Sequence, residues 1–210
     1  MYGISPLAID KKFMDYKNRL KGAITQVLLK SLLEDAGYRI VPLGIEEVLR
    51  ELSSLEQEHY KQLNLPPALR KLPDFFVADM EFKKTYLVEV KYRKYWNEGT
   101  KSYLGKTLLQ QIKYWNPLVL MLFIGNPINP SRYQPTPAHC MGVLWLDYED
   151  EDEEVIWEDC KGVYSWDSVE WGNFKRVQDI FTDVSQKWSE KTLYKTMSLV
   201  SSLKDLDFFD

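Results

Sequence analysis

The chain has 210 residues, of which 45% are hydrophobic, and a formal net charge of −4 at pH 7. This length and apolar share suffice for one domain with its own core, and the net charge argues against a general polyanion binder. Two cysteines and two histidines are too few for a disulfide framework or a four-ligand zinc site. The longest apolar run, LVLMLFIG at 118–125, is too short to span a bilayer, and the first residues do not resemble a signal peptide. We expect a single domain over 1–210, in a reducing cytoplasm and without a membrane.

The first half of the chain predicts a helix, a strand, a second helix and then two strands. Apolar residues recur at helical spacing over 10–36, and Gly37 supplies the left-handed residue that commonly ends a helix. The short strand YRIVPLG and a helix at about 45–57 follow, until the proline-rich segment NLPPALRKLP. DFFVA and YLVEVKYR are typical of two antiparallel strands within 74–92, joined by the polar turn DMEFKKT.

The second half predicts a loop rich in Tyr, Trp and Lys, and then a helix from about Leu104 to Trp115, which Pro117 should end. LVLMLFIG is typical of a strand covered on both faces, and NPINPSRYQPTP of a loop. MGVLWLDY and VIWED predict a hairpin. A last helix over 173–190 offers either a homodimer interface or a surface that packs on its own sheet, and the tail after about Leu193 has no assignment. This order predicts an α/β fold with a mixed β-sheet flanked by helices.

Charge is distributed unevenly along this framework. Between Lys83 and Lys113 the only acids are Glu89 and Glu98, among many lysines and arginines, whereas the segment 147–159 holds acids and no base. The acidic run 147–154 is typical of a solvated hairpin tip. A functional interpretation would make it a brake on non-specific DNA binding or a docking site for a basic partner.

Glu89 and Lys91 stand out because they lie two residues apart, on one face of the otherwise apolar strand YLVEVKYR. An acid followed two residues later by lysine recurs elsewhere in the chain, but only this pair lies inside an apolar strand, and Pro73-Asp74 opens the strand before it. Alone, the pair would be a solvated ion pair on an exposed edge, which contributes little. The presence of Asp74 on the neighbouring strand favours a functional site.

Pro-Asp in LPDFFVA followed by Glu-x-Lys in YLVEVKYR resembles the PD-(D/E)XK nuclease superfamily, the restriction-endonuclease-like fold. The resemblance covers residues 10 to about 125 and implies a core of order α-β-β-β-α-β. The residues over about 126–210 would be a C-terminal extension that adds a hairpin and a helix as decoration. The resemblance also implies a Mg²⁺-dependent endonuclease or exonuclease that hydrolyses phosphodiester bonds, with DNA as the expected substrate and Mg²⁺ or Mn²⁺ as cofactor. Family members are often dimers, so a homodimer is one expectation.

The resemblance assigns roles to the charged residues. Asp74, Glu89 and the backbone carbonyl of Val90 would hold the metal, and Lys91 would orient or deprotonate the attacking water. Hard oxygen ligands suit Mg²⁺, and a cation beside the scissile phosphate would offset charge in the transition state.

Two further positions of the family pattern are less clear in this chain. The family often adds a glutamate from the first helix, where this chain has Gln26. It also adds a glutamine, sometimes followed four residues later by tyrosine, from the helix after the motif. Gln110 with Tyr114 fits that spacing and Gln111 is its rival, although both glutamines could equally occupy the solvent face of the helix.

The segment KYRKYWNEGTKSYLGK interleaves cations with aromatic residues, a composition typical of nucleic-acid contacts, although its aromatic side chains could instead pack inward. The candidate contact residues are Arg93, Lys94, Tyr95, Trp96, Lys101, Lys106 and Tyr114.

Two alternatives to an enzyme stay open. The chain could be a non-catalytic nucleic-acid-binding or protein-interaction module that kept the nuclease fold, which Gln26 and the negative net charge favour. It could also be a structural partner protein that uses its acidic hairpin and last helix.

Overall fold

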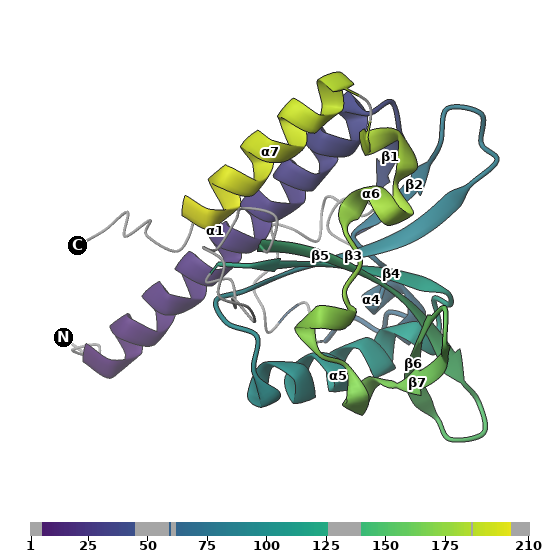
Figure 1. The fold of residues 1–210 in the computed structure, drawn as a ribbon. Coiled ribbons are helices and arrows are strands. Elements are labelled where there is room, and N and C mark those ends of the chain that lie inside the picture. The colour runs from purple at the N-terminus through teal and green to yellow at the C-terminus, as the bar shows by residue number, and fades with distance from the viewer. Residues whose placement is uncertain (1–5, 45–58, 60–61, 126–139, 186, 203–210) are drawn as a thin grey trace.

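The computed structural model describes residues 6–44, 59, 62–125, 140–185 and 187–202 (Figure 1). The strands in this part of the chain form one sheet of seven, in the order β1-β2-β3-β4-β5-β6-β7. They are β1 (Arg39–Pro42), β2 (Phe75–Ala78), β3 (Thr85–Arg93), β4 (Leu118–Ile124), β5 (Met141–Glu149), β6 (Glu154–Asp159) and β7 (Gly162–Ser165). The helices are α1 (Pro6–Asp35), α4 (Pro67–Arg70), α5 (Glu98–Ile112), α6 (Val177–Ile180) and α7 (Lys187–Ser202), with 3₁₀ turns η3 (Trp166–Ser168), η4 (Trp171–Asn173) and η5 (Thr182–Ser185). The predicted α/β fold with a mixed sheet is confirmed.

Neighbouring strands of the sheet are antiparallel, with one exception at its centre. β3 and β4 are parallel, with Glu89 opposite Leu120 and Lys91 opposite Leu122. A parallel pair needs a crossover, which α5 supplies between the two strands. Apart from the short helix α4 between β1 and β2, the described elements from α1 to β4 follow the predicted order α-β-β-β-α-β, and β5 to β7 extend the same sheet.

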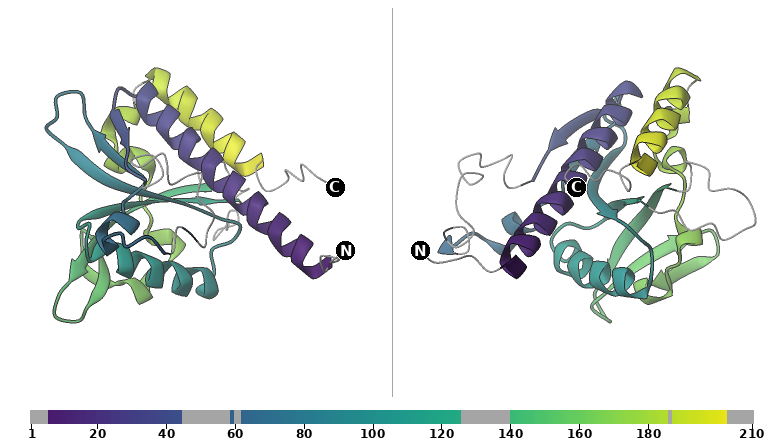
Figure 2. Two further views of the ribbon diagram at one scale, coloured as in Figure 1. Left: turned by 180° about the vertical axis from the view of Figure 1, so that it is seen from behind. Right: turned by 90° about the vertical axis from the view of Figure 1, so that its left-hand side faces the viewer.

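Helices cover both faces of the sheet. α1 and α7 lie side by side on one face and α5 lies on the other, as both views of Figure 2 show. Each face has its own apolar cluster: Val88 and Val90 belong to the cluster on the α1 side, and Leu120 and Leu122 to that on the α5 side. All seven residues of β4 are buried, as predicted for a strand covered on both faces. Full burial of each such side chain contributes roughly 1.5–3 kcal/mol.

The first helix ends as its sequence predicts. Gly37 has a φ of 91°, which places it in the left-handed region. The amide of Tyr38 donates to the carbonyl of Leu33 at 2.9 Å, and that of Gly37 to Glu34 at 3.0 Å. These two bonds satisfy carbonyls that the end of the helix would otherwise leave without partners. The cap turns the chain directly into β1.

The helix after β3 begins earlier than predicted, at Glu98 instead of about Leu104. The side chain of Asn97 accepts a hydrogen bond from the amide of Thr100 at 2.9 Å and so caps the first turn. Lys101 therefore lies on α5 and not in the predicted loop, and Lys106 lies on the helix as predicted. The helix also ends earlier, at Ile112 instead of Trp115.

The single helix predicted over 173–190 is wrong. Lys175 instead exchanges two backbone hydrogen bonds with Val143 of β5, at 3.0 and 2.8 Å, and this extended stretch breaks the helical pattern. Gly142 makes the approach possible, because a Cβ there would lie 2.8 Å from the Cβ of Phe174. The homodimer interface predicted on that helix therefore loses its basis. The residues after about Leu193, which the sequence left without an assignment, continue α7 as far as Ser202. The strand β7 was not predicted.

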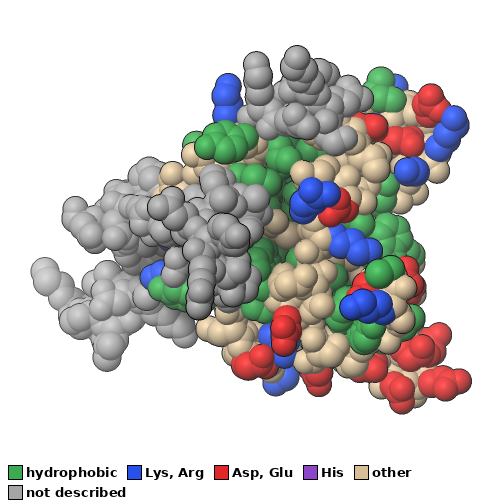
Figure 3. Space-filling model, viewed as in Figure 1, with side chains coloured by type: hydrophobic (Ala, Val, Ile, Leu, Met, Phe, Trp, Pro, Cys, Tyr) green, Lys and Arg blue, Asp and Glu red, His purple; other side chains and the backbone are tan. Residues whose placement is uncertain are grey.

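The hairpin with an acidic tip is confirmed, since Glu149 pairs with Glu154 across the ends of β5 and β6. In Figure 3 acidic side chains gather at the lower right, where this hairpin ends. The helix predicted at about 45–57 and the loop predicted at 126–137 lie outside the described residues. Within the described ranges, no helix has both the length and the apolar composition to cross a membrane.

Candidate active site

The hairpin of β2 and β3 brings Asp74 and Glu89 together. Phe75 pairs with Val88, so Asp74, the residue before Phe75, falls beside Glu89. Side chains alternate along β3: Val88 and Val90 belong to the core on the α1 side, whereas Glu89 faces α5. The prediction that Glu89 and Lys91 share one face of this strand is confirmed, since the two side chains bond to each other.

Glu89 is the most enclosed acid of the site, with 6% of its side chain exposed. Its Oε1 accepts from the Nζ of Lys91, whose side chain is 22% exposed. Its Oε2 accepts from the Nε2 of Gln111 at 2.7 Å, and the same nitrogen lies 3.4 Å from the carbonyl oxygen of Leu72. A buried carboxylate with both oxygens hydrogen-bonded keeps a fixed position.

Asp74 is held by two donors of its own. Its Oδ1 accepts from the Nε2 of Gln26 on α1 at 2.8 Å, and its Oδ2 accepts from the backbone amide of Val90 at 2.7 Å. The second bond places Asp74 against the peptide that lies between Glu89 and Lys91. The role of the Val90 carbonyl as a metal ligand stays a prediction.

The two acids repel each other in an environment that disfavours charge. Burial, and after it the charge of Glu89, raise the pKa of Asp74 from 3.8 to about 7. Burial lowers the pKa of Lys91, but the carboxylates of Glu89 and Asp74 outweigh it, and the net shift is upward. Lys91 is therefore protonated at neutral pH, and its single positive charge faces two acids.

The structure separates the two glutamines that the sequence left as rivals. Gln111 is buried and bonds to Glu89, whereas Gln110 is exposed and accepts from the Nζ of Lys71 at 2.9 Å. The site glutamine is therefore Gln111, and Tyr114 does not follow it at the family's spacing. Gln26 does occupy the expected position on the first helix, as an amide that donates to Asp74.

The residues fit one divalent cation. In the described part of the chain no group of three or more His, Cys, Asp and Glu side chains is placed to bind a metal. Mg²⁺ needs only one or two carboxylates, because water and phosphate oxygens complete its shell. Each oxygen of Asp74 and Glu89 accepts one hydrogen bond from the protein and keeps a second lone pair. The buried Oε1 of Gln111 has no hydrogen-bond partner among the described residues, so a further oxygen that could bind a metal lies next to Glu89.

Two of the candidate nucleic-acid contact residues, Trp96 and Lys101, make contacts within the protein instead. Trp96 packs against Trp166 and Phe174, with ring centroids 6.2 and 5.3 Å away. Lys101 is 13% exposed, donates to the carbonyl of Asp167 at 2.9 Å and pairs with Glu98. The contact role predicted for Trp96 and Lys101 is therefore withdrawn, because both side chains hold α5 and its neighbours together.

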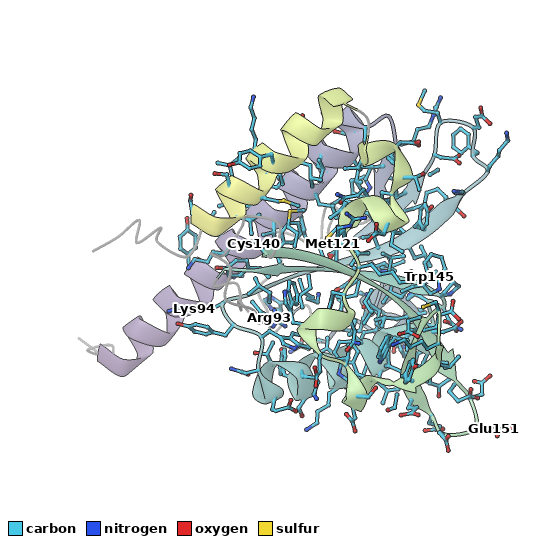
Figure 4. All side chains as sticks on the ribbon, viewed as in Figure 1. Arg93, Lys94, Met121, Cys140, Trp145 and Glu151 are labelled. Atoms are coloured by element: carbon cyan, nitrogen blue, oxygen red, sulfur yellow. The ribbon has the colours of Figure 1, made fainter. Side chains whose placement is uncertain are left out.

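The other candidates lie at the surface. Lys94 and Tyr95 follow β3 and are exposed, and so are Lys106 and Tyr114 on and just after α5. Arg93 is half-buried at the end of β3. In Figure 4 Lys94 lies at the left of the molecule, Arg93 lies nearer its middle, and Glu151 of the acidic hairpin tip lies at the lower right. The cations that follow Lys91 therefore lie away from the main acidic patch.

Comparisons of the chain with protein-family models, with curated proteins and with solved structures found no significant match. The function proposed below therefore rests on the side chains of the site and their geometry.

The neighbouring glutamines provide a matched test of the site. Replacing Gln111 with alanine removes a donor to buried Glu89, and we expect metal affinity to fall roughly 10–100-fold, as for other residues that orient metal ligands. Gln110→Ala should leave metal affinity unchanged, because Gln110 is exposed and bonds to Lys71. Titration calorimetry with Mn²⁺ measures both variants. Equal affinities in the two would remove Gln111 from the site.

Proposed function

We propose that this chain is a metal-dependent nuclease that hydrolyses phosphodiester bonds, with DNA as the expected substrate. The observation that carries the proposal is the convergence of Asp74, Glu89, Lys91 and Gln111 at one place: Asp74 directly precedes β2, Glu89 and Lys91 lie on β3, and Gln111 lies on α5. A solvated ion pair on an edge strand would not need these partners, and Glu89 lies on a strand with neighbours on both sides. Metal-assisted hydrolysis needs carboxylates to hold the metal and a cation to offset charge, and Asp74, Glu89 and Lys91 supply these groups. The raised pKa of Asp74 is also typical of a functional site.

Asp74 and Glu89 would hold Mg²⁺ or Mn²⁺, with the Val90 carbonyl as a further ligand. When bound, the metal supplies a Lewis acid for the phosphate and its attacking water. Gln26 and Gln111 hold the two carboxylates in place through their amide donors.

The upward pKa shift of Lys91 favours one of its two predicted roles. A protonated lysine has three N–H donors and a positive charge, so it can orient the attacking water and stabilise charge on the pentavalent transition state. Proton abstraction would require its pKa to fall towards neutrality instead.

Arg93 is the best-supported contact for a neighbouring phosphate. It lies two residues after Lys91 on the same strand, and its guanidinium lies 5.4 Å from the ring centroid of Tyr103. Burial lowers its pKa, and none of the described acids forms an ion pair with it. Its Nη1 donates to the carbonyl of Tyr92 at 2.7 Å, but no described carboxylate balances its charge, and a DNA phosphate would do so.

Arg93→Ala is expected to weaken DNA binding and to flatten its salt dependence. Loss of one phosphate contact lowers the slope of log K against log salt by about 0.9 for duplex DNA and about 0.7 for a single strand. Arg39→Ala is the matched control, since Arg39 also lies over a ring, 4.9 Å from that of Phe82, but on strand β1 at the edge of the sheet. Fluorescence anisotropy over a salt series measures both, and equal slopes would remove Arg93 from the contact surface.

Incubation of the purified chain with plasmid, linear duplex and single-stranded DNA tests the proposed activity. Mg²⁺ or Mn²⁺ should support cleavage of at least one substrate, and a chelator should stop it. Binding of DNA without cleavage and without metal affinity would support instead the non-catalytic module that kept the fold.

A further inference from the structure

A pocket of about 360 Å³ is lined by residues of α4 and of the C-terminal part of α5, together with residues next to each helix. Leu65, Pro67 and Leu109 give it an apolar lining, and Tyr114, which is 50% exposed, adds an aromatic ring. The indole nitrogen of Trp115 donates to the carbonyl of Ala68 at 3.0 Å, which links α4 to the segment that directly follows α5. The pocket thus combines an apolar lining with an exposed aromatic ring.

The charged side chains of the pocket are all positive. Arg70, Lys71 and Lys113 line it, and no carboxylate occurs among its described lining residues. Lys113 pairs with Glu153 at 3.1 Å, but that pair is exposed, and such pairs contribute only about 0–1 kcal/mol. A ligand phosphate can therefore replace Glu153 at little cost.

The pocket adjoins the candidate active site through both of its walls. Lys71 lies three residues before Asp74, at most about 10 Å of extended chain. Gln110 lines the pocket, and the next residue, Gln111, bonds to Glu89 inside the site. The Nε2 of Gln111 also lies 3.4 Å from the carbonyl oxygen of Leu72, the residue after Lys71, so the two segments that line the pocket meet at the site.

We propose that this pocket binds an unpaired nucleotide next to the scissile bond, so that the protein prefers single-stranded DNA or frayed ends over intact duplex. The proposal rests on the proposed nuclease function. Cations neutralise the phosphates of a single strand, and its unpaired bases stack on exposed aromatic rings. A base inside a duplex has no free face to offer Tyr114.

The test uses the full chain and a fluorescent oligothymidylate in the presence of EDTA, so that no cleavage occurs. Tyr114→Ala should weaken binding roughly 5- to 150-fold, the equivalent of one lost base stack, whereas Tyr114→Phe should bind like the wild type. Lys71→Gln should reduce the salt slope by about 0.7. Tyr194→Ala, which changes a 64% exposed tyrosine on α7, should have no effect.

The outcomes separate this proposal from the nuclease proposal. If Tyr114→Ala binds the oligothymidylate as tightly as the wild type, or if an intact duplex binds as tightly as the single strand, the pocket proposal is overturned even if DNA is cut. If the single strand is preferred and Tyr114→Ala weakens its binding, the pocket binds an unpaired nucleotide even where no metal supports cleavage, and only the nuclease proposal fails.

Discussion

Replacing Lys91 with alanine is expected to lower DNA cleavage roughly 10²–10⁴-fold, the usual effect of a residue that acts on the attacking group. Lys91 is the cation that faces both Asp74 and Glu89, and its side chain is still 22% exposed, so substrate can reach it. The loss should appear in kcat, because Lys91 would act mainly on the transition state.

The alanine variant also leaves Glu89 without its cation, and removal of one partner from a buried ion pair can cost about 3–5 kcal/mol of stability. Lys91→Gln keeps a donor for Glu89 and separates the loss of charge from the loss of fold. Asp74→Asn is the second variant of the site and should abolish metal-dependent cleavage. Lys84→Ala, an exposed lysine in the turn before β3, is the control. Initial rates on plasmid DNA decide the matter: wild-type cleavage by Lys91→Gln and Asp74→Asn would refute the site.

The stability of the metal-free protein is expected to fall as the pH rises through about 7. The folded pKa of Asp74, about 7, lies above its ordinary value of 3.8, so the folded state binds this proton more tightly than the unfolded chain. Its contribution is fully present below pH 3.8 and is lost as the pH rises to about 7. The full effect is up to about 4 kcal/mol, at 1.36 kcal/mol per pKa unit.

Other groups change the total pH dependence, so the prediction concerns a difference between two proteins. Asp179, whose pKa is lowered by Arg176, contributes stability that is lost as the pH falls. Lys91 has a raised pKa, and its contribution stays complete until well above neutrality. The difference in melting temperature between wild type and Asp74→Asn should therefore change between about pH 5 and about pH 8. The same difference in melting temperature at both pH values would contradict the raised pKa of Asp74.

Metal should reverse this loss of stability. A cation binds the ionised carboxylates, so Mg²⁺ or Mn²⁺ should raise the melting temperature more at about pH 8 than at about pH 5, and its binding should release protons. In Asp74→Asn the added metal should have little effect at either pH.

The site glutamine could have been chosen from the sequence by helical periodicity alone. Gln111 follows Leu104 by seven residues and Leu108 by three, so it lies on the buried stripe of α5, whereas Gln110 does not. The spacing to Tyr114 pointed to the wrong neighbour. On α1, Gln26 likewise precedes Leu29 by three residues and Leu33 by seven, and a polar residue on a buried stripe is the indication that was missed.

The strands β2 and β3 could be predicted because each is a run of consecutive, mostly apolar residues. The segment 173–190 could not, since its apparent helical stripe belongs to residues that the core buries from several short elements. Val177, Phe181 and Val184 are all fully buried, as predicted for a stripe, but they come from α6, η5 and the residue between them. The backbone bonds between Lys175 and Val143 decide this, and they join residues distant in the sequence. The early start of α5 was predictable from Asn97, a typical N-cap residue.

A crystal of this protein soaked with Mn²⁺ tests the central claim most directly. Anomalous density for one ion between Asp74 and Glu89, with oxygen ligands from both acids and Lys91 nearby, is the predicted result. Density for Mn²⁺ elsewhere, or none at this place at a neutral or basic pH where both acids are ionised, would contradict a metal-dependent active site here.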